Sequence, residues 1–176
     1  RLILRLLEKL LHALTASQLL LGGLIKVRRH QSKCRQLAVR CHVEAETAAH
    51  LTRQPDPAAL WHGAMGGAFF EGWAVLEAVK AFAARGRRAP LHFWRSNDGL
   101  EVDLLIEAGG RTHGVEIKQT ATPLPGHARG LEKLRQLLGE TLAGESLLVC
   151  RVEKPALLPG GVRAVPWRDF PAWVME

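Results

Sequence analysis

Two adjacent glycines, Gly109-Gly110, separate two stretches with the residue pattern of β-strands, 102–107 and 113–118. Glycine adopts a positive φ without steric cost, so a glycine pair is typical of the tight two-residue turn of a β-hairpin. The turn fixes the register, and a slip by one residue would move every side chain to the opposite face. The glycine pair therefore predicts that the two stretches pair and which residues lie opposite each other.

The predicted register gathers charged residues on one face of the hairpin. It places Asp103 opposite Glu116 and Glu101 opposite Lys118, and all four side chains share a face because side chains alternate along a strand. The other face is apolar and is expected to cover the core; it carries Val102, Leu104, Ile106, Val115 and Ile117. Opposed carboxylates repel, and a divalent cation between them would reverse that effect. For Lys118, an ion pair with Glu101 is the alternative role.

A helix predicted over 68–84 contributes a third carboxylate. At about 100° per residue, Glu71 lies on the same side as the apolar residues of the helix, and Glu77 lies roughly opposite. A carboxylate on an inward face is costly to bury unless it is paired or binds a metal. Glu71 is therefore a candidate site residue. The alternative is that it only stabilises the N-terminal end of the helix dipole.

The remaining patterns complete an α/β order. Aromatic residues predict a strand over 91–95, a leucine stripe predicts a helix over 127–138, and short apolar runs predict a buried strand over 147–150 and an edge strand over 162–165. From Ala68 onward the predicted order is helix, three strands, helix, strand.

The first sixty residues differ in composition from the rest of the chain. All five Phe and all five Trp lie at or after Trp61. Residues 1–60 carry ten basic and four acidic residues, whereas residues 61–176 carry fourteen and thirteen, so most of the net charge of +7 precedes Trp61. We expect a helical or irregular appendage over residues 1–60 and a domain over residues 61–176. The appendage is interpreted either as a helical segment that packs on something else or as degenerate or frame-shifted sequence.

Several functional classes are disfavoured. The longest leucine-rich run, 14–25, is too short to span a membrane, so no membrane partner is expected. Three cysteines form no disulfide framework and fit a reducing, cytoplasmic location. A zinc site lacks the paired spacing typical of structural sites; the residues considered for it are His30, Cys34, Cys41 and His42.

Three motifs together resemble a known family. They are the runs 67–71, ending in Glu71, 93–103, ending in Asp103, and 115–118, which reads Val-Glu-Ile-Lys. The set resembles the C-terminal domain of uncharacterised bacterial and archaeal AAA-type ATPases, which is similar to the PD-(D/E)XK nuclease superfamily, including Holliday-junction resolvases. This resemblance implies a restriction-endonuclease-like α-β-β-β-α-β core with a mixed sheet, preceded by a helical N-terminal segment. By the same resemblance, residues 1–60 would hold a truncated or degenerate winged-helix-like segment.

The resemblance also implies a site and a function. Glu71, Asp103, Glu116 and Lys118 match the catalytic positions, with Asp103 and Glu116 as ligands of Mg²⁺ or Mn²⁺, and the substrate would be DNA phosphodiesters. The phosphate-binding loop of the ATPase module has no counterpart here, so no ATP site is expected and the chain resembles an isolated C-terminal part. The alternative is an inactive nuclease-fold module that docks an ATPase module, another protein partner or nucleic acid.

Overall fold

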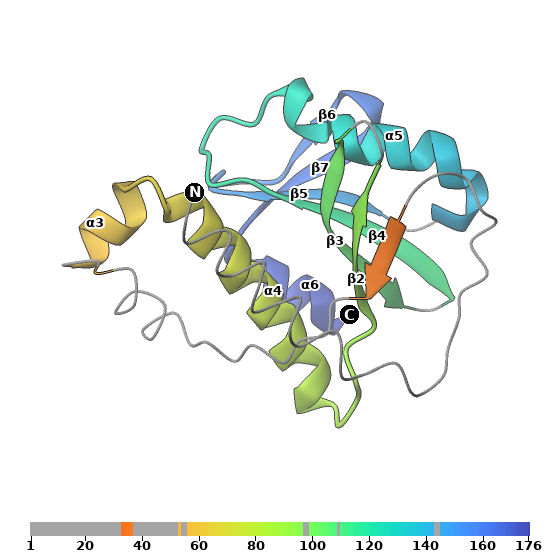
Figure 1. Ribbon diagram of the computed structural model, residues 1–176, viewed down its shortest axis with the longest axis horizontal. Helices are drawn as coiled ribbons and strands as arrows, with labels where there is room; N and C mark the ends of the chain where they lie inside the picture. The colour runs from red at the N-terminus through yellow and green to blue at the C-terminus, as the bar shows by residue number, and fades with distance from the viewer. Residues whose placement is uncertain (1–32, 37–52, 54–55, 97–98, 109, 143–144) are drawn as a thin grey trace. The chain divides into compact units, whose positions relative to one another are not determined.

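The computed structural model describes residues 33–36, 53, 56–96, 99–108, 110–142 and 145–176 (Figure 1). The predicted helical segment at the N-terminus lies outside these ranges, as do His30, Cys41 and His42 of the zinc set, so those predictions stay predictions. Within the described residues, no helix has the length and apolar character that a membrane-spanning segment requires.

A seven-stranded mixed sheet forms the centre of the fold, in the order β1-β2-β3-β4-β5-β7-β6. Its strands are β1 (Lys33–Gln36), β2 (Leu91–Arg95), β3 (Glu101–Ala108), β4 (Arg111–Ile117), β5 (Ser146–Cys150), β6 (Ala156–Leu158) and β7 (Val162–Pro166). Neighbours from β1 to β4 are antiparallel, β4-β5 and β5-β7 are parallel, and β6 is antiparallel to β7. Strand β4 is therefore where the sheet changes from antiparallel to parallel pairing.

Helices cover both faces of this sheet (Figure 1). The helices are α3 (Pro57–His62), α4 (Gly66–Ala84), α5 (Arg129–Leu138) and α6 (Phe170–Met175), and the 3₁₀ turns are η1 (Pro125–Ala128), η2 (Gly139–Leu142) and η3 (Pro159–Gly161). One core lies between the sheet and helices α4 and α6, and the second lies under α5. Because both faces are covered, the charged face predicted for the β3–β4 hairpin is not an open surface.

The predicted fold class is confirmed. Elements α4, β2, β3, β4, α5 and β5 follow one another in the α-β-β-β-α-β order. The hairpin register is also confirmed from Ala108↔Arg111 to Leu104↔Val115. Gly110 has φ +74°, as the tight turn requires, and Gly109 lies outside the described residues. Local turn chemistry was thus sufficient to set this pairing.

Several elements differ from the prediction. Strand β7 is not an edge strand: it pairs with β5 on one side and with β6 on the other, which leaves the three-residue β6 at the edge. Strands β1 and β6 and helices α3 and α6 were not predicted. Helix α3 begins at Pro57, because the Asp56 carboxylate caps it by accepting a hydrogen bond from the Ala59 amide at 2.7 Å.

A bulge in β3 changes which core receives Val102. His92 pairs with Leu105, and two residues later Trp94 pairs with Val102, so β3 has one residue more than β2 over this stretch. The extra residue lies at Asp103-Leu104, opposite Phe93. Val102 therefore packs in the core under α5 while Leu104 packs in the core under α4, and the prediction that they share a face is wrong.

Candidate metal centre

Asp103 lies at the bulge, at the point where β3 and β4 separate. The last backbone pair of the ladder is Leu104↔Val115. Beyond it, the Ile117 amide donates to Asp103 Oδ2 at 2.8 Å, so a side chain takes the place of the next backbone acceptor. The Asp103 residue is 8% exposed. The bulge and this hydrogen bond together hold the carboxylate in one position at the end of the hairpin.

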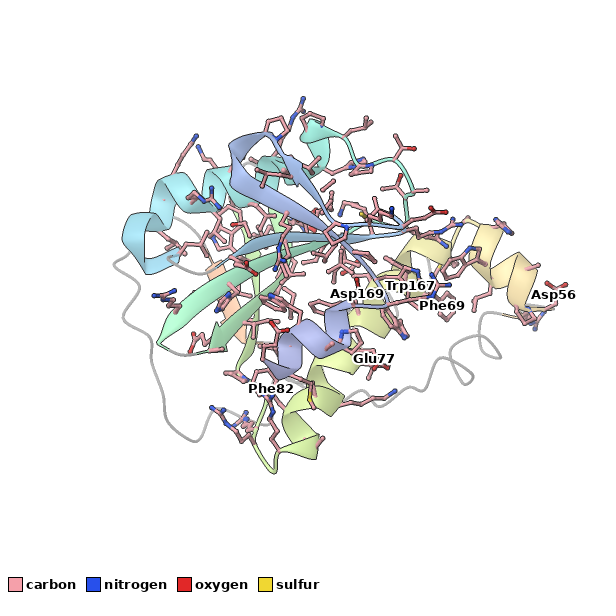
Figure 2. All side chains as sticks on the ribbon, turned by 180° about the vertical axis from the view of Figure 1, so that it is seen from behind. Asp56, Phe69, Glu77, Phe82, Trp167 and Asp169 are labelled. Carbon is pink, nitrogen blue, oxygen red and sulfur yellow. The ribbon has the colours of Figure 1, made fainter. Side chains whose placement is uncertain are left out.

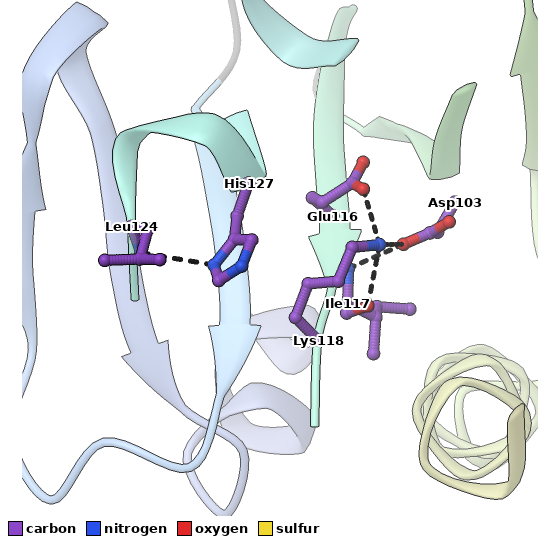
Figure 3. A network of polar contacts seen from close by, with 6 residues as sticks. All are labelled: Asp103, Glu116, Ile117, Lys118, Leu124 and His127. Atoms are coloured by element: carbon purple, nitrogen blue, oxygen red, sulfur yellow. Dashed lines mark hydrogen bonds and ion pairs between the residues drawn. The ribbon is translucent and has the colours of Figure 1, made fainter. Parts of the chain in front are cut away.

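The Lys118 ammonium contacts three oxygens at once (Figure 3). Lys118 Nζ lies 2.6 Å from Glu116 Oε1, 3.2 Å from Asp103 Oδ2 and 3.2 Å from the Ile117 carbonyl oxygen. The Lys118 backbone continues the sheet hydrogen bonding, since its amide donates to the Val149 carbonyl at 3.0 Å. We call these three oxygens, with the ammonium among them, the carboxylate cage.

Glu116 brings an unsatisfied oxygen to the carboxylate cage. It pairs with Leu148 of β5 and lies on the face that α5 covers, with 9% of its side chain exposed. Its Oε1 accepts from Lys118, whereas its Oε2 is buried and has no hydrogen-bond partner among the described residues. A buried carboxylate oxygen without a partner carries a desolvation cost that a bound cation would remove.

Burial and mutual repulsion perturb the acidic groups. Burial, followed by the charge of Asp103, raises the pKa of Glu116 to about 7. Burial and then Asp103 also raise the pKa of Glu71 to about 7. For Lys118, burial lowers the pKa, but Asp103 and Glu116 together raise it more, so the net pKa is raised. The site thus holds more negative charge than one ammonium balances.

Glu71 lies on α4 near this cluster but not in the carboxylate cage. After burial, the charges of Asp103, Lys118 and Glu101 shift its pKa, so Glu71 interacts electrostatically with these groups. The residue is half-buried, and within the described part of the chain it forms no hydrogen bond or ion pair through its side chain. Glu71 and Glu77 are both half-buried on α4; Glu77, which was expected on the solvated side, has only 22% of its side chain exposed and pairs with Lys80 at 3.0 Å.

The predicted alternative partner of Lys118 is engaged elsewhere. Glu101 Oε1 lies 2.7 Å from Arg95 Nη1, across the β2–β3 pair. Strand β4 ends at Ile117, so Lys118 lies beyond the ladder that would have placed it opposite Glu101. The expected Glu101–Lys118 pairing is therefore wrong, and Lys118 instead contacts Asp103 and Glu116.

The donor atoms of the carboxylate cage suit a hard cation. Mg²⁺ typically binds through one or two carboxylates, together with waters and substrate phosphates. Asp103 Oδ2, Glu116 Oε1 and the Ile117 carbonyl are oxygen donors that already surround a positive charge, and Glu116 Oε2 is unpartnered. Across the described ranges, no three His, Cys, Asp or Glu side chains are grouped to hold a metal by themselves. A cation here would complete its shell with water or substrate.

The structure brings in residues that sequence reasoning did not single out. Gln119 Nε2 donates to the Trp61 carbonyl at 2.7 Å and so joins the residue after Lys118 to the helix α3 region. Gly66 lies against the same two groups: a Cβ there would lie 2.6 Å from the Trp61 carbonyl oxygen. Gln119 could have been singled out in the sequence because it directly follows the Glu-Ile-Lys motif. No local pattern in the sequence indicates that Trp61 is its partner.

Comparison with known proteins identifies the family. The pattern of a family described as "Domain of unknown function (DUF4143)" matches residues 66–170, which is more than half of the chain. The chain belongs to the DUF4143 family. The matched range of this DUF4143 domain runs from the start of α4 to the start of α6 and contains all four predicted site residues.

Two curated relatives of this DUF4143 domain come from mycobacteria. An uncharacterized protein of Mycobacterium tuberculosis and one of Mycobacterium bovis are each 46% identical to the chain over 57 residues. The matched stretch is 32% of this chain and 12% of each relative, so the similarity concerns a small part of those proteins.

Proposed function

We propose that the domain is a metal-dependent, nuclease-like domain that acts on DNA phosphodiesters with Mg²⁺ or Mn²⁺. In the same proposal it is the C-terminal part of an AAA-type ATPase-family protein and works in the cytoplasm. The observation that carries the proposal is the carboxylate cage, in which a cation is already surrounded by Asp103 Oδ2, Glu116 Oε1 and the Ile117 carbonyl. The family resemblance of the Glu71, Asp103 and Glu116-Ile117-Lys118 motifs supports the same reading.

Each residue has a distinct role in the proposed reaction. Asp103 and Glu116 hold the metal, together with the Ile117 carbonyl. When bound, Mg²⁺ would polarise the phosphate and lower the pKa of the attacking water. Lys118, released from the carboxylates, orients that water or stabilises charge that develops on the phosphate. Glu71, near the cluster and otherwise unpaired among the described residues, orients water beside the metal or helps to hold a second ion.

The test is cleavage of DNA with and without a divalent cation. We expect the chain to cut or nick DNA only with Mg²⁺ or Mn²⁺, because without a cation the carboxylates repel the phosphate. Lys118→Met should lower turnover by roughly 10²–10³-fold, as expected for loss of a charge-stabilising donor. Glu77→Gln, which changes another half-buried carboxylate of α4, one that pairs with Lys80, is the matched control and should retain activity.

An inactive docking module is the second candidate, and one observation favours it. The Lys118 ammonium contacts all three cage oxygens, so this lysine already balances part of the negative charge of the two carboxylates. A site kept in this form would need no metal, and the fold would serve to bind a protein partner, such as an ATPase module, or nucleic acid.

Metal titration separates the two candidates. In the nuclease proposal Mg²⁺ competes with the ammonium for the same oxygens, so calorimetry should show tighter Mg²⁺ binding for Lys118→Met than for the original chain. In the docking proposal neither protein binds Mg²⁺. A second outcome would contradict the proposal that this chain is a nuclease by itself: a folded chain that binds Mg²⁺ but cuts no single-stranded, double-stranded or branched DNA.

A further inference from the structure

Two tryptophans and two arginines form a continuous row on the domain. The guanidinium carbon of Arg151 lies 5.1 Å from the ring centroid of Trp61, and that of Arg168 lies 4.4 Å from the ring centroid of Trp167. The two indole rings are 6.2 Å apart between centroids and are tilted by 53°. We call these four residues the Arg-Trp row. Each guanidinium lies on an aromatic ring, and the rings join the two pairs.

The Arg-Trp row is hydrogen-bonded to the segment that directly follows the carboxylate cage in the chain. Gln119, the residue after Lys118, donates to the Trp61 carbonyl at 2.7 Å, and the Arg151 amide donates to the Thr120 carbonyl at 2.7 Å. Arg151 directly follows the parallel strand β5, and Trp167 and Arg168 are the first two residues after β7, as Lys118 is the first after β4. In open α/β sheets, ligands bind outside the carboxyl ends of parallel strands. The row and the cage therefore share the edge at which a ligand is expected.

Packing against helix α4 explains the positions of the two tryptophans, but within the described part of the domain no contact requires the charges of the two arginines. Trp61 and Trp167 both contact Phe70 of α4, with ring centroids 6.0 and 6.2 Å away, and both rings remain only half-buried. Figure 2 shows Trp167 beside the N-terminal half of α4. Arg151 and Arg168 are exposed, and among the described residues neither forms an ion pair. Their charge is thus available to a ligand.

We propose that the Arg-Trp row binds an unpaired, single-stranded stretch of nucleic acid next to the carboxylate cage. This inference rests on the proposed function for the reaction and adds the substrate class. Guanidinium groups bind phosphate in a bidentate manner, and bases stack both on guanidinium planes and on the part of the half-buried indole rings that remains exposed. Two positive charges separated by two aromatic rings match the alternating phosphate and base chemistry of a single strand, whose bases are free to stack. A duplex keeps its bases stacked internally and offers only its phosphates.

Binding is tested by fluorescence anisotropy of the full chain with a labelled oligothymidylate and a matched duplex, in EDTA. We expect tighter binding of the single strand. Arg151→Gln combined with Arg168→Gln should reduce the slope of log affinity against log salt by about 1.4, because each lost phosphate contact on a single strand changes it by about 0.7. Trp61→Leu should weaken binding by roughly five-fold or more, once circular dichroism shows that it folds.

A matched control removes the same charge elsewhere. Arg85→Gln combined with Arg88→Gln changes two exposed arginines just beyond the other end of α4, and it should leave the salt slope unchanged. An unchanged slope in the Arg151/Arg168 variant, an equal loss in the control, tighter binding of the duplex, or no binding of either oligonucleotide would overturn the proposal. Because EDTA prevents metal-dependent cleavage, this result is independent of whether the domain proves to be a nuclease.

Discussion

At the scale of single residues, the site is defined by an imbalance of charge. Asp103 and Glu116 are both buried, Glu71 lies near them, and Lys118 is the cation that contacts the first two. The raised pKa values of Glu71 and Glu116 follow from burial and from this excess of carboxylates. Such groups change protonation near neutral pH, so the stability of the metal-free domain should depend on pH there.

Glu116→Gln tests this dependence. The pKa of Glu116 is about 7 in the folded chain, against an ordinary 4.5. Between these values the folded state holds a proton that the unfolded state has released, so raising the pH lowers the free energy of unfolding. We expect the metal-free chain to lose on the order of 1–3 kcal/mol from this group between pH 4.5 and 8. Urea unfolding across this range should show a smaller loss in Glu116→Gln; an identical loss would contradict the assignment.

At the scale of elements, the position of α5 on the sheet depends on a close backbone contact. A Cβ on Gly130, in the first turn of α5, would clash with the Glu101 carbonyl oxygen and would lie 3.1 Å from its carbonyl carbon. These atoms belong to the backbone of β3, which the β2–β3 and β3–β4 ladders hold in place. The missing side chain of Gly130 therefore allows α5 to approach the strand that carries Asp103.

Two helical glycines should respond in opposite directions to the same substitution. Gly72 lies inside α4, and a Cβ there would meet nothing within 4 Å, so Gly72→Ala should stabilise the domain by up to about 1 kcal/mol through helix propensity. Gly130→Ala should destabilise it by about 1–3 kcal/mol or more, because β3 or α5 must move. Thermal unfolding of both variants provides the measurement. Stabilisation by Gly130→Ala would show that α5 does not rest on β3 in this way.

At the scale of the whole molecule, the site lies where the sheet changes its pairing. Strand β4 is antiparallel to β3 and parallel to β5, and its end is held from both sides by the Ile117 bond to Asp103 and the Lys118 bond to Val149. The two cores, with α4 and α6 on one face and α5 on the other, bury both sides of this junction. A cation bound to the carboxylate cage would therefore stabilise the whole domain.

Magnesium should raise the melting temperature of the intact chain. At a free concentration ten times the dissociation constant, a ligand of the folded state adds about 1.4 kcal/mol to stability, which corresponds to a rise of about 3–6 °C for a chain of this size. Asp103→Asn keeps an oxygen for the Ile117 amide but removes a charge from the cage, so its melting temperature should not respond. Sodium chloride of equal ionic strength is the control for salt effects. An equal rise in Asp103→Asn would place Mg²⁺ elsewhere.

The sequence alone determined the features that depend on neighbouring residues. The Gly109-Gly110 turn and the alternation around it were sufficient for the β3–β4 register, and the periodic patterns were sufficient for the α-β-β-β-α-β order. Turn geometry and side-chain alternation arise within a few residues, so they can be read without knowing the fold. The candidate residues Glu71, Asp103, Glu116 and Lys118 were found in the same way, on three elements whose facing sides were predictable.

Only the tertiary structure decided the features that depend on contacts between distant segments. Because of the bulge opposite Phe93, Val102 packs in the core under α5. Glu101 pairs with Arg95 and not with Lys118. Strand β6 pairs with β7, so β7 is not at the edge of the sheet. The Arg-Trp row joins residues more than a hundred positions apart, from Trp61 to Arg168. None of these contacts leaves a periodic trace in the sequence, because each depends on packing that forms only when the sheet and its helices are assembled.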